Sequence, residues 1–279
     1  MKYNLDTIKN IELNYVTKNN LDENIIDLIN LLEGIISAKN YKLTPNFVYK
    51  SKIIVNRDNI DKLIDSLRLN INKLSDKNYN NQIIKIKNNL QELHKEFEDS
   101  DIEKCSLIIF EIASTNLFYS KLYAKLYHDL SNEFTLLKVP LISTLKTFIK
   151  SYDSIENISS VNNYDLFCKI IKDNEKRLAT LNFFIELIKF SAVDINFILD
   201  IISHVIVTIK QSHTKQSDIE QLVEHLYLII INLHQLLKDY DIWTDITNFV
   251  EVYKKMKPKD NISYKTIFRF MDIHDIIKE

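Results

Sequence analysis

The chain has 279 residues, of which 46 % are hydrophobic and 27 % are charged, and its formal net charge is −2. This composition is ordinary for a protein that buries a core, and the charge excludes a strong, general binder of polyanions. One glycine and three prolines argue against sheet-rich folds and glycine-rich nucleotide loops, because only glycine adopts positive φ freely. We therefore expect an all-α protein.

Apolar residues recur at spacings of three and four along most of the chain, which is the pattern of amphipathic helices. The first such stripe lies in residues 25–36, and residues 38–56 are expected to form an irregular connector. A second stripe runs from Ile60 to Leu74, with Asp58 as its expected cap, and Ser75 is expected to cap the helix after it. The further helices are expected at about 76–97, 102–117, 119–131, 137–152, 163–172, 174–190, 194–211, 216–238, 242–255 and 263–277.

The organisation of these segments favours two parts, an N-terminal helical extension and connector at 1–57 and a helical domain at 58–279. The helix at 216–238 is apolar on its main stripe and also carries Leu228 and Ile231 off that stripe, so it is expected to be covered on two sides. Helices of this kind joined by short links suit a stacked array of antiparallel pairs. An irregular helical bundle is the alternative.

Three separated segments carry a resemblance to one known domain. Residues Ile71 to Tyr79, which read Ile-Asn-Lys-Leu-Ser-Asp-Lys-Asn-Tyr, resemble the Leu-Asn-Lys-Leu-Thr-Pro-Glu-Asn-Phe turn that opens the middle domain of eukaryotic translation initiation factor 4G. Asn72 and Lys73 are among the identical positions, whereas Asp76 and Lys77 replace the family's proline and glutamate.

The other two segments follow in the same order as in that family. Thr180 to Lys189 is similar to the family's Asn-Ile-Lys-Phe-Ile-Gly-Glu-Leu-Phe-Lys helix, with Ile185 in place of the glycine. Ser263 to Ile273 is similar to the Ser-Ser-Arg-Ile-Arg-Phe-Met-Leu-Gln-Asp-Val segment that closes the domain, with Phe268 and Asp272 aligned. The resemblance covers about residues 58–279.

This resemblance implies a HEAT-like solenoid of antiparallel helical pairs, with about ten to twelve helices. It also implies a function, that of a non-catalytic scaffold of translation initiation which binds and stimulates a DEAD-box RNA helicase of the initiation factor 4A type. No tyrosine is followed by the spacing of a cap-binding-protein motif, so a cap-binding partner is expected, if at all, through residues 1–57.

The resemblance places the helicase contacts at the two ends of the domain. They are expected to be Asn72 and Lys73 in the opening turn, and Lys265 (which stands for an arginine), Phe268 and Asp272 near the end. A core position for Phe268, and capping or bridging roles for Asn72 and Asp272, remain open as alternatives.

A cluster of lysines gives a second candidate surface. Weak, non-specific RNA contact is expected there, since clustered lysines bind phosphates, and a solvated loop is the alternative. The cluster consists of Lys254, Lys255, Lys257 and Lys259.

Other chemistry is not indicated. The seven histidines form no His-Glu-x-x-His pattern and no Cys/His pair at ligand spacing, and no carboxylate pair stands out, so we expect no enzyme, no cofactor and no metal. Cys105 and Cys168 do not form a disulfide framework, residues Met1 to Ile11 lack a signal-peptide core, and Leu226 to Ile231 is the longest apolar run. A cytoplasmic protein is therefore expected.

Two other functions stay open beside the scaffold of translation. The same type of middle domain occurs in factors of nonsense-mediated decay and in the large subunit of the nuclear cap-binding complex, which acts in RNA export. A structural interaction protein that has lost helicase binding is the third reading, and the departures at Asp76, Lys77 and Ile185 are the reason to keep it.

Overall fold

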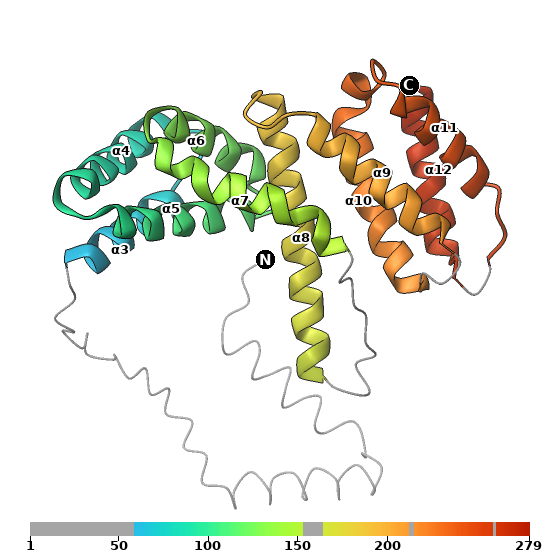
Figure 1. Cartoon of the computed structure of the whole chain (residues 1–279), viewed down its shortest axis with the longest axis horizontal. Helices are drawn as coiled ribbons and strands as arrows, with labels where there is room; N and C mark the ends of the chain where they lie inside the picture. Colours follow the sequence, from blue (N-terminus) through green and yellow to red (C-terminus); the bar gives the residue numbers. More distant parts are fainter. Residues whose placement is uncertain (1–58, 153–163, 212–214, 259–260) are drawn as a thin grey trace, which may run out of the picture. The chain divides into compact units, whose positions relative to one another are not determined.

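The computed structural model describes residues 59–152, 164–211, 215–258 and 261–279. Within these ranges the chain is all-α, with ten α-helices, two short 3-10 helices and no strand, which confirms the expected class (Figure 1). These residues belong to one compact unit, Asn56–Glu279. The helix expected at 25–36, the cap at Asp58 and the other predictions for 1–57 lie outside the described residues.

Within the described residues, the first half of the compact unit consists of five α-helices and two short 3-10 helices. Their bounds are α3 (Asn59–Asn72), α4 (Tyr79–Glu96), α5 (Asp99–Ser114), α6 (Ser120–Glu133), η1 (Thr135–Leu137), α7 (Lys138–Phe148) and η2 (Ile149–Tyr152).

The second half begins with α8, the longest of the helices that the structure describes. Its elements are α8 (Tyr164–Lys189), α9 (Asn196–Lys210), α10 (Gln216–Leu237), α11 (Ile242–Tyr253) and α12 (Tyr264–Lys278). Most of the predicted boundaries differ from these by three residues or fewer.

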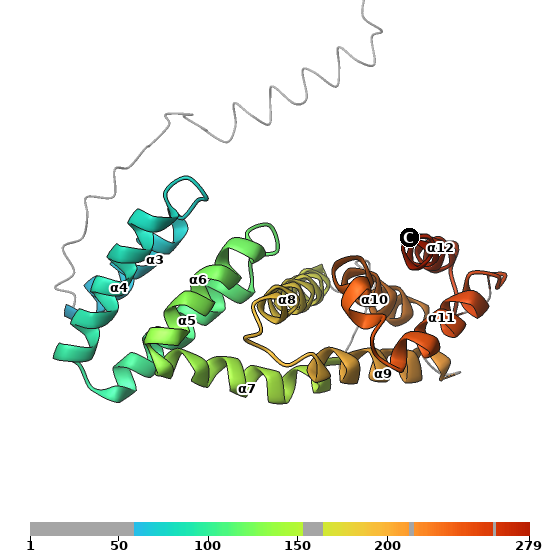
Figure 2. The same cartoon turned by 90° about the horizontal axis from the view of Figure 1, so that it is seen from above.

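The helices pack in two rows along the compact unit. The even-numbered helices α6, α8, α10 and α12 each contact the next one, and the odd-numbered helices α3, α5 and α7, and then α9 and α11, do the same. Neighbours along the chain also pack as pairs, α3 with α4, α5 with α6, α9 with α10, and α11 with α12. Figure 2 shows α8, α10 and α12 in one row, with α7, α9 and α11 in the other.

The prediction of separate helices at 163–172 and 174–190 is wrong, because α8 runs without a break through Asp173. Neither proline nor glycine interrupts this segment, so nothing in the backbone forces an end there. Asn174 is buried inside the helix, where its Oδ1 accepts a hydrogen bond of 2.7 Å from Nη1 of Arg177. A local partner thus removes the cost of burying that amide.

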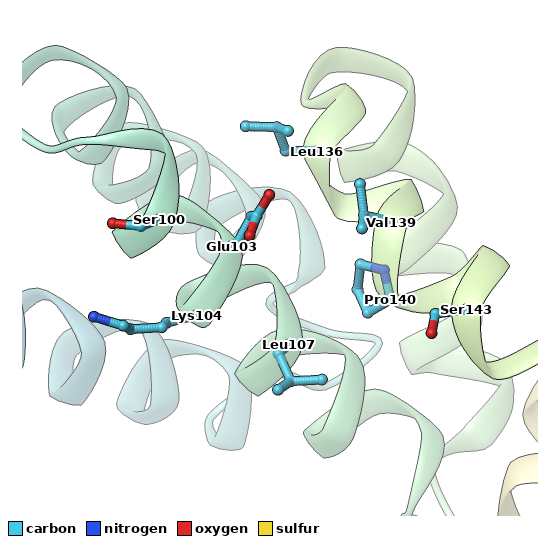
Figure 3. A pocket seen from close by; sticks show the side chains of 8 residues that line it. All are labelled: Ser100, Glu103, Lys104, Leu107, Leu136, Val139, Pro140 and Ser143. Carbon is cyan, nitrogen blue, oxygen red and sulfur yellow. The ribbon is translucent and has the colours of Figure 1, made fainter.

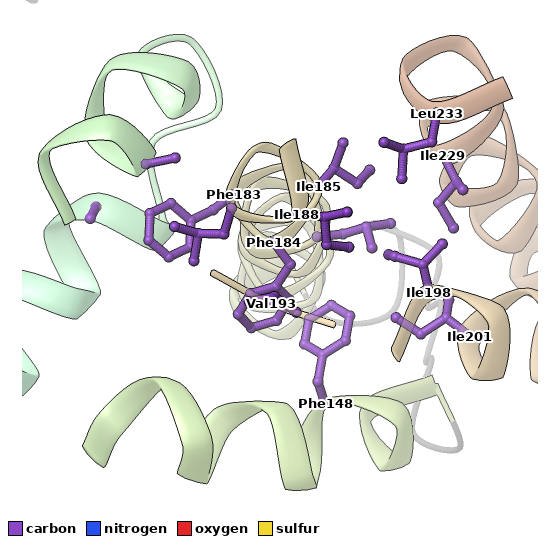
Figure 4. Close-up of a cluster of buried hydrophobic side chains, with 14 of the residues drawn as sticks. Phe148, Phe183, Phe184, Ile185, Ile188, Val193, Ile198, Ile201, Ile229 and Leu233 are labelled. Carbon is purple, nitrogen blue, oxygen red and sulfur yellow. The ribbon is translucent and has the colours of Figure 1, made fainter. Parts of the chain in front are cut away.

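The core is densest around the second half of α8. Phe183 and Phe184 are both fully buried, and because successive residues on a helix are turned by about 100°, they face different neighbours (Figure 4). Phe183 meets Phe110 of α5 and Tyr127 of α6 edge-on, with ring centroids 5.9 and 5.5 Å away. Phe184 meets α7 and α9 in the same way. One helix therefore joins the two halves of the unit.

Candidate functional site

The opening turn between α3 and α4 is closed by one side chain, that of Asn78. Its Oδ1 accepts a hydrogen bond from the backbone N–H of Ser75 (2.8 Å), and its Nδ2 donates to the backbone carbonyl of Lys73 (2.8 Å). The prediction that Ser75 caps the next helix is wrong, since α4 begins only at Tyr79. Asp76 also lies in the turn rather than in the helix. The turn is thus shaped by Asn78, one of the residues of the opening motif.

The first predicted contact set lies on this turn. Asn72 is the last residue of α3, and both it and Lys73 are exposed. The start of α4 is tied to α6, because the hydroxyl of Tyr79 donates to Oδ2 of Asp129 (2.6 Å) and Nζ of Lys125 lies 4.2 Å from the centroid of the Tyr79 ring. Asn72 and Lys73 are therefore exposed residues beside a helix start that is held in place by contacts with α6.

A hollow of about 440 Å³ opens beside the opening turn, and we call it the Phe118 hollow. Phe118, in the connection between α5 and α6, has 86 % of its surface exposed. Its ring meets that of Tyr119 edge-on, with centroids 4.8 Å apart. The residues that line the hollow are Asp76, Phe118, Tyr119, Lys121, Leu122, Lys125 and Phe190. Sequence periodicity did not single them out, because no local pattern shows that an aromatic residue in a connection stays uncovered.

The second predicted contact set lies on α12. Ser263 caps this helix, its Oγ accepting a hydrogen bond from the backbone N–H of Thr266 (3.1 Å). Arg269 holds the helix against α10, because its Nε and Nη2 donate to Oε1 of Glu224 at 3.1 and 3.0 Å. Its Nη1 donates to Oδ2 of Asp272 (2.9 Å). Asp272 is thus half of an ion pair within its own helix, and its role as a contact stays a prediction.

Phe268 is not a core residue. With Tyr264 and Met271 it forms an exposed apolar stripe at spacings of four and three, with 66 % of Tyr264, 59 % of Phe268 and 42 % of Met271 accessible to solvent. The rings of Tyr264 and Phe268 are close to parallel, at 27° and 6.3 Å between centroids. Beside the stripe, Nζ of Lys265 pairs with Oε2 of Glu220 at 3.4 Å.

The structure does not bring the two contact sets together. The opening turn belongs to helices that pack on α5, whereas α12 packs on α10 and α11. Figures 1 and 2 show the two at opposite ends of the compact unit. They form two separate surfaces, as the resemblance implies for contacts at the two ends of the domain.

The predicted RNA-facing lysines are partly neutralised. Lys254 and Lys255 both pair with Glu251, at 2.7 and 3.1 Å. Hydrogen bonds from these two ammonium groups lower the pKa of Glu251 to about 2. Lys257 is exposed, and Lys259 lies outside the described residues. The free positive charge of this patch is therefore smaller than the sequence indicates.

Figure 3 shows a further groove between α5 and α7, with a volume of about 440 Å³. Its walls are mainly apolar, from Leu107, Leu136, Val139 and Pro140. In the part of the chain that the structure describes, no group of three or more His, Cys, Asp or Glu side chains could hold a metal ion.

A buried polar cluster that no sequence pattern indicated lies where η2, α8 and α10 meet. His225 is completely buried, and within the described ranges neither of its ring nitrogens has a hydrogen-bond partner. The Tyr152 ring meets it edge-on at 5.3 Å between centroids. Burial, and then the positive charge of Arg177, lower the pKa of His225 to about 3. Its ring is therefore neutral at neutral pH.

No model of a protein family matches the chain, and no curated protein matches it. No helix in the described ranges is both long enough and apolar enough to span a bilayer. The sequence motifs and the geometry above therefore carry the functional argument.

Proposed function

We propose that the domain at 58–279 is a HEAT-like solenoid of antiparallel helical pairs. Two features support this arrangement, namely the pairing of helices that are adjacent in the chain and the contacts between successive even-numbered and successive odd-numbered helices. Stacked repeats show this pattern, because each unit contacts only its neighbours.

We propose further that the chain is a non-catalytic scaffold of translation initiation which acts in the cytoplasm. It binds a DEAD-box RNA helicase of the initiation factor 4A type and stimulates it, and a cap-binding protein is a further partner through residues 1–57. One observation supports this proposal most. Phe268, which the resemblance of the closing segment selected, lies in the middle of an exposed stripe on α12 and does not fill the core.

The chemistry of this stripe suits a protein partner. Aromatic side chains that become fully desolvated supply most of the binding energy at interfaces. The helix that carries Tyr264 and Phe268 is already held against α10 by the hydrogen bonds between Arg269 and Glu224. The loss of conformational entropy on binding a partner is therefore small. Lys265, Asp272 and their ion pairs form a polar rim beside the stripe.

The test is the RNA-dependent ATPase rate of a purified 4A-type helicase, measured with increasing amounts of the full chain. We expect the rate to rise, and the double variant Lys265→Ala/Phe268→Ala to raise the half-maximal concentration at least about tenfold. Val252→Ala, at an exposed residue on α11, is the matched control and should behave as the wild type. Circular dichroism checks that the helices are intact.

The result that would contradict the scaffold is a full chain that neither binds nor stimulates several helicases of this type. The candidate functions would then be nonsense-mediated decay, or nuclear cap binding and RNA export. A structural interaction protein without a helicase would also fit. Asp76 and Lys77 in the opening turn are the observation that favours this last reading, because they replace the family's residues on an exposed surface.

A further inference from the structure

The Phe118 hollow joins aromatic faces with positive charge. Phe118 is the most exposed of the large hydrophobic residues that the structure describes, and Leu117 and Tyr119 on either side of it are also exposed. An isolated surface phenylalanine needs no explanation. Three consecutive exposed apolar residues, of which Phe118 and Tyr119 line a hollow of about 440 Å³, do need one, because they offer a water-exposed apolar face that a ligand can cover.

Among the residues that the structure describes, the lysines around this hollow pair with no carboxylate. Lys121 and Lys125 line it, and Lys73 and Lys77 lie in the adjoining opening turn. No carboxylate of the residues that the structure covers forms an ion pair with any of these four lysines, although Asp76 also lines the hollow. At the other end of the unit, by contrast, Lys254, Lys255 and Lys265 are all paired.

We infer that the Phe118 hollow binds single-stranded RNA without sequence preference. Phe118 and Tyr119 offer their rings to the bases, and Lys121 and Lys125 bind the flanking phosphates. Every nucleotide supplies a planar face and a negative charge, so a groove of aromatic and basic side chains matches the strand whatever its sequence. RNA then binds at the end of the unit that carries the opening turn, and the lysines from Lys254 to Lys259 contribute little to RNA binding.

An acidic, apolar peptide is the competing ligand for such a surface. The two exposed rings of Phe118 and Tyr119 favour RNA, because aromatic side chains that are accessible to solvent can stack on bases. Lys125 favours RNA as well, since its ammonium already lies over the Tyr79 ring and so stands at a fixed position for a phosphate. This assignment does not depend on helicase binding.

The experiment is fluorescence anisotropy of a fluorescein-labelled oligouridylate of about 12 nucleotides, titrated with the full chain at salt concentrations from about 50 to about 200 mM. We expect Phe118→Ala to weaken binding about tenfold at every salt concentration, since a stacked base is lost. Lys121→Ala/Lys125→Ala should weaken binding and also reduce the slope of log affinity against log salt by about 1.4, because two phosphate contacts with a single strand are lost.

The matched control is Lys254→Ala/Lys255→Ala/Lys257→Ala, which removes charge at the other end and should stay within about twofold of the wild-type affinity. The inference is overturned if the full chain does not bind the oligonucleotide, or if this control variant loses binding while the two hollow variants keep it. It is also overturned if Phe118→Ala abolishes helicase stimulation but leaves RNA affinity unchanged, since the hollow would then dock a protein. No helicase is present in the anisotropy assay, so its outcome is separate from that of the scaffold proposal.

Discussion

Two single residues in this domain have structural roles that their neighbours in the chain do not reveal. Asn78 closes the opening turn through two hydrogen bonds of its amide. His225 is a polar side chain held without a hydrogen-bond partner in the described part of the structure, between the Tyr152 ring and the charge of Arg177. Removing the first should weaken the fold, whereas the second makes stability depend on pH.

For His225 the pKa is about 3 in the folded chain, against an ordinary value of 6.5. Below pH 6.5 the unfolded chain therefore binds a proton that the folded chain does not, and stability falls as the pH drops toward 3. We expect the free energy of unfolding to fall by about 2 kcal/mol between pH 7 and pH 5 from this residue. Urea denaturation at these pH values measures it.

The matched variants are His225→Leu, which should flatten this part of the pH dependence, and His94→Leu at an exposed histidine, which should leave it in place. Equal pH dependence in both variants would show that the histidine at 225 is solvated.

For Asn78 we expect the variant Asn78→Ala to lower the free energy of unfolding by about 1–3 kcal/mol, because two hydrogen bonds are lost together. Asn88→Ala, at an exposed position on α4, should change it by less than about 0.5 kcal/mol. Chemical denaturation compares the two. A loss no larger at Asn78 than at Asn88 would mean that the turn keeps its shape without the amide.

At the scale of elements, α8 is the helix on which the two halves of the compact unit meet. Its residues from Leu181 to Leu187 are all buried except the half-buried Asn182, and the matched motif of the family lies in this stretch. Lys189 at its end donates to Oε1 of Glu186 (2.6 Å) and to Oδ1 of Asn232 on α10 (3.1 Å). Packing in the core and this polar contact therefore account for the residues of the segment without a contact to another protein.

We expect Phe184→Ala to destabilise the domain by about 3–5 kcal/mol, because it leaves a cavity among Phe148, Phe197 and the rest of the core. Phe268→Ala is the matched control, the same change at an exposed ring, and should cost less than about 1 kcal/mol. Thermal or urea unfolding measures both. A similar cost at the two sites would mean that Phe268 is covered in solution.

At the scale of the whole compact unit, the helices differ in how many neighbours cover them. α8 packs against α5, α6 and α10, and its aromatic residues also reach α7 and α9. α4 packs mainly on α3 and, less extensively, on α5. In an array of units that contact only their neighbours, the ends open more readily than the middle.

This difference predicts the pattern of amide hydrogen exchange measured by mass spectrometry on the full chain. The amides of α8 from Thr180 to Lys189 should exchange slowest, and those of α4 should exchange markedly faster. Equal protection of α4 and α8 would indicate one all-or-none core rather than a graded array.

The sequence by itself determined the helices, because the apolar spacing that marks a helix is local. The stripes of α3 and α10, the start of α12 and, in the residues that the structure describes, the absence of strands follow from it. Through the resemblance, the sequence also pointed to Phe268 and the opening turn as candidate contact sites. It misplaced the start of α4, because the turn before that helix is closed by the side chain of Asn78, and it divided α8, which runs without a break.

Only the tertiary structure decided which side chains stay uncovered and which charges are paired. Phe118 and Phe184 are the same residue type, and one is exposed while the other is enclosed. Lys121 and Lys265 likewise differ, because Glu220 of another helix lies 3.4 Å from the ammonium of Lys265. Both properties depend on residues far away in the chain, and periodicity carries no information about which faces meet. The surfaces proposed for the helicase and for RNA could therefore be defined only after the helices were packed.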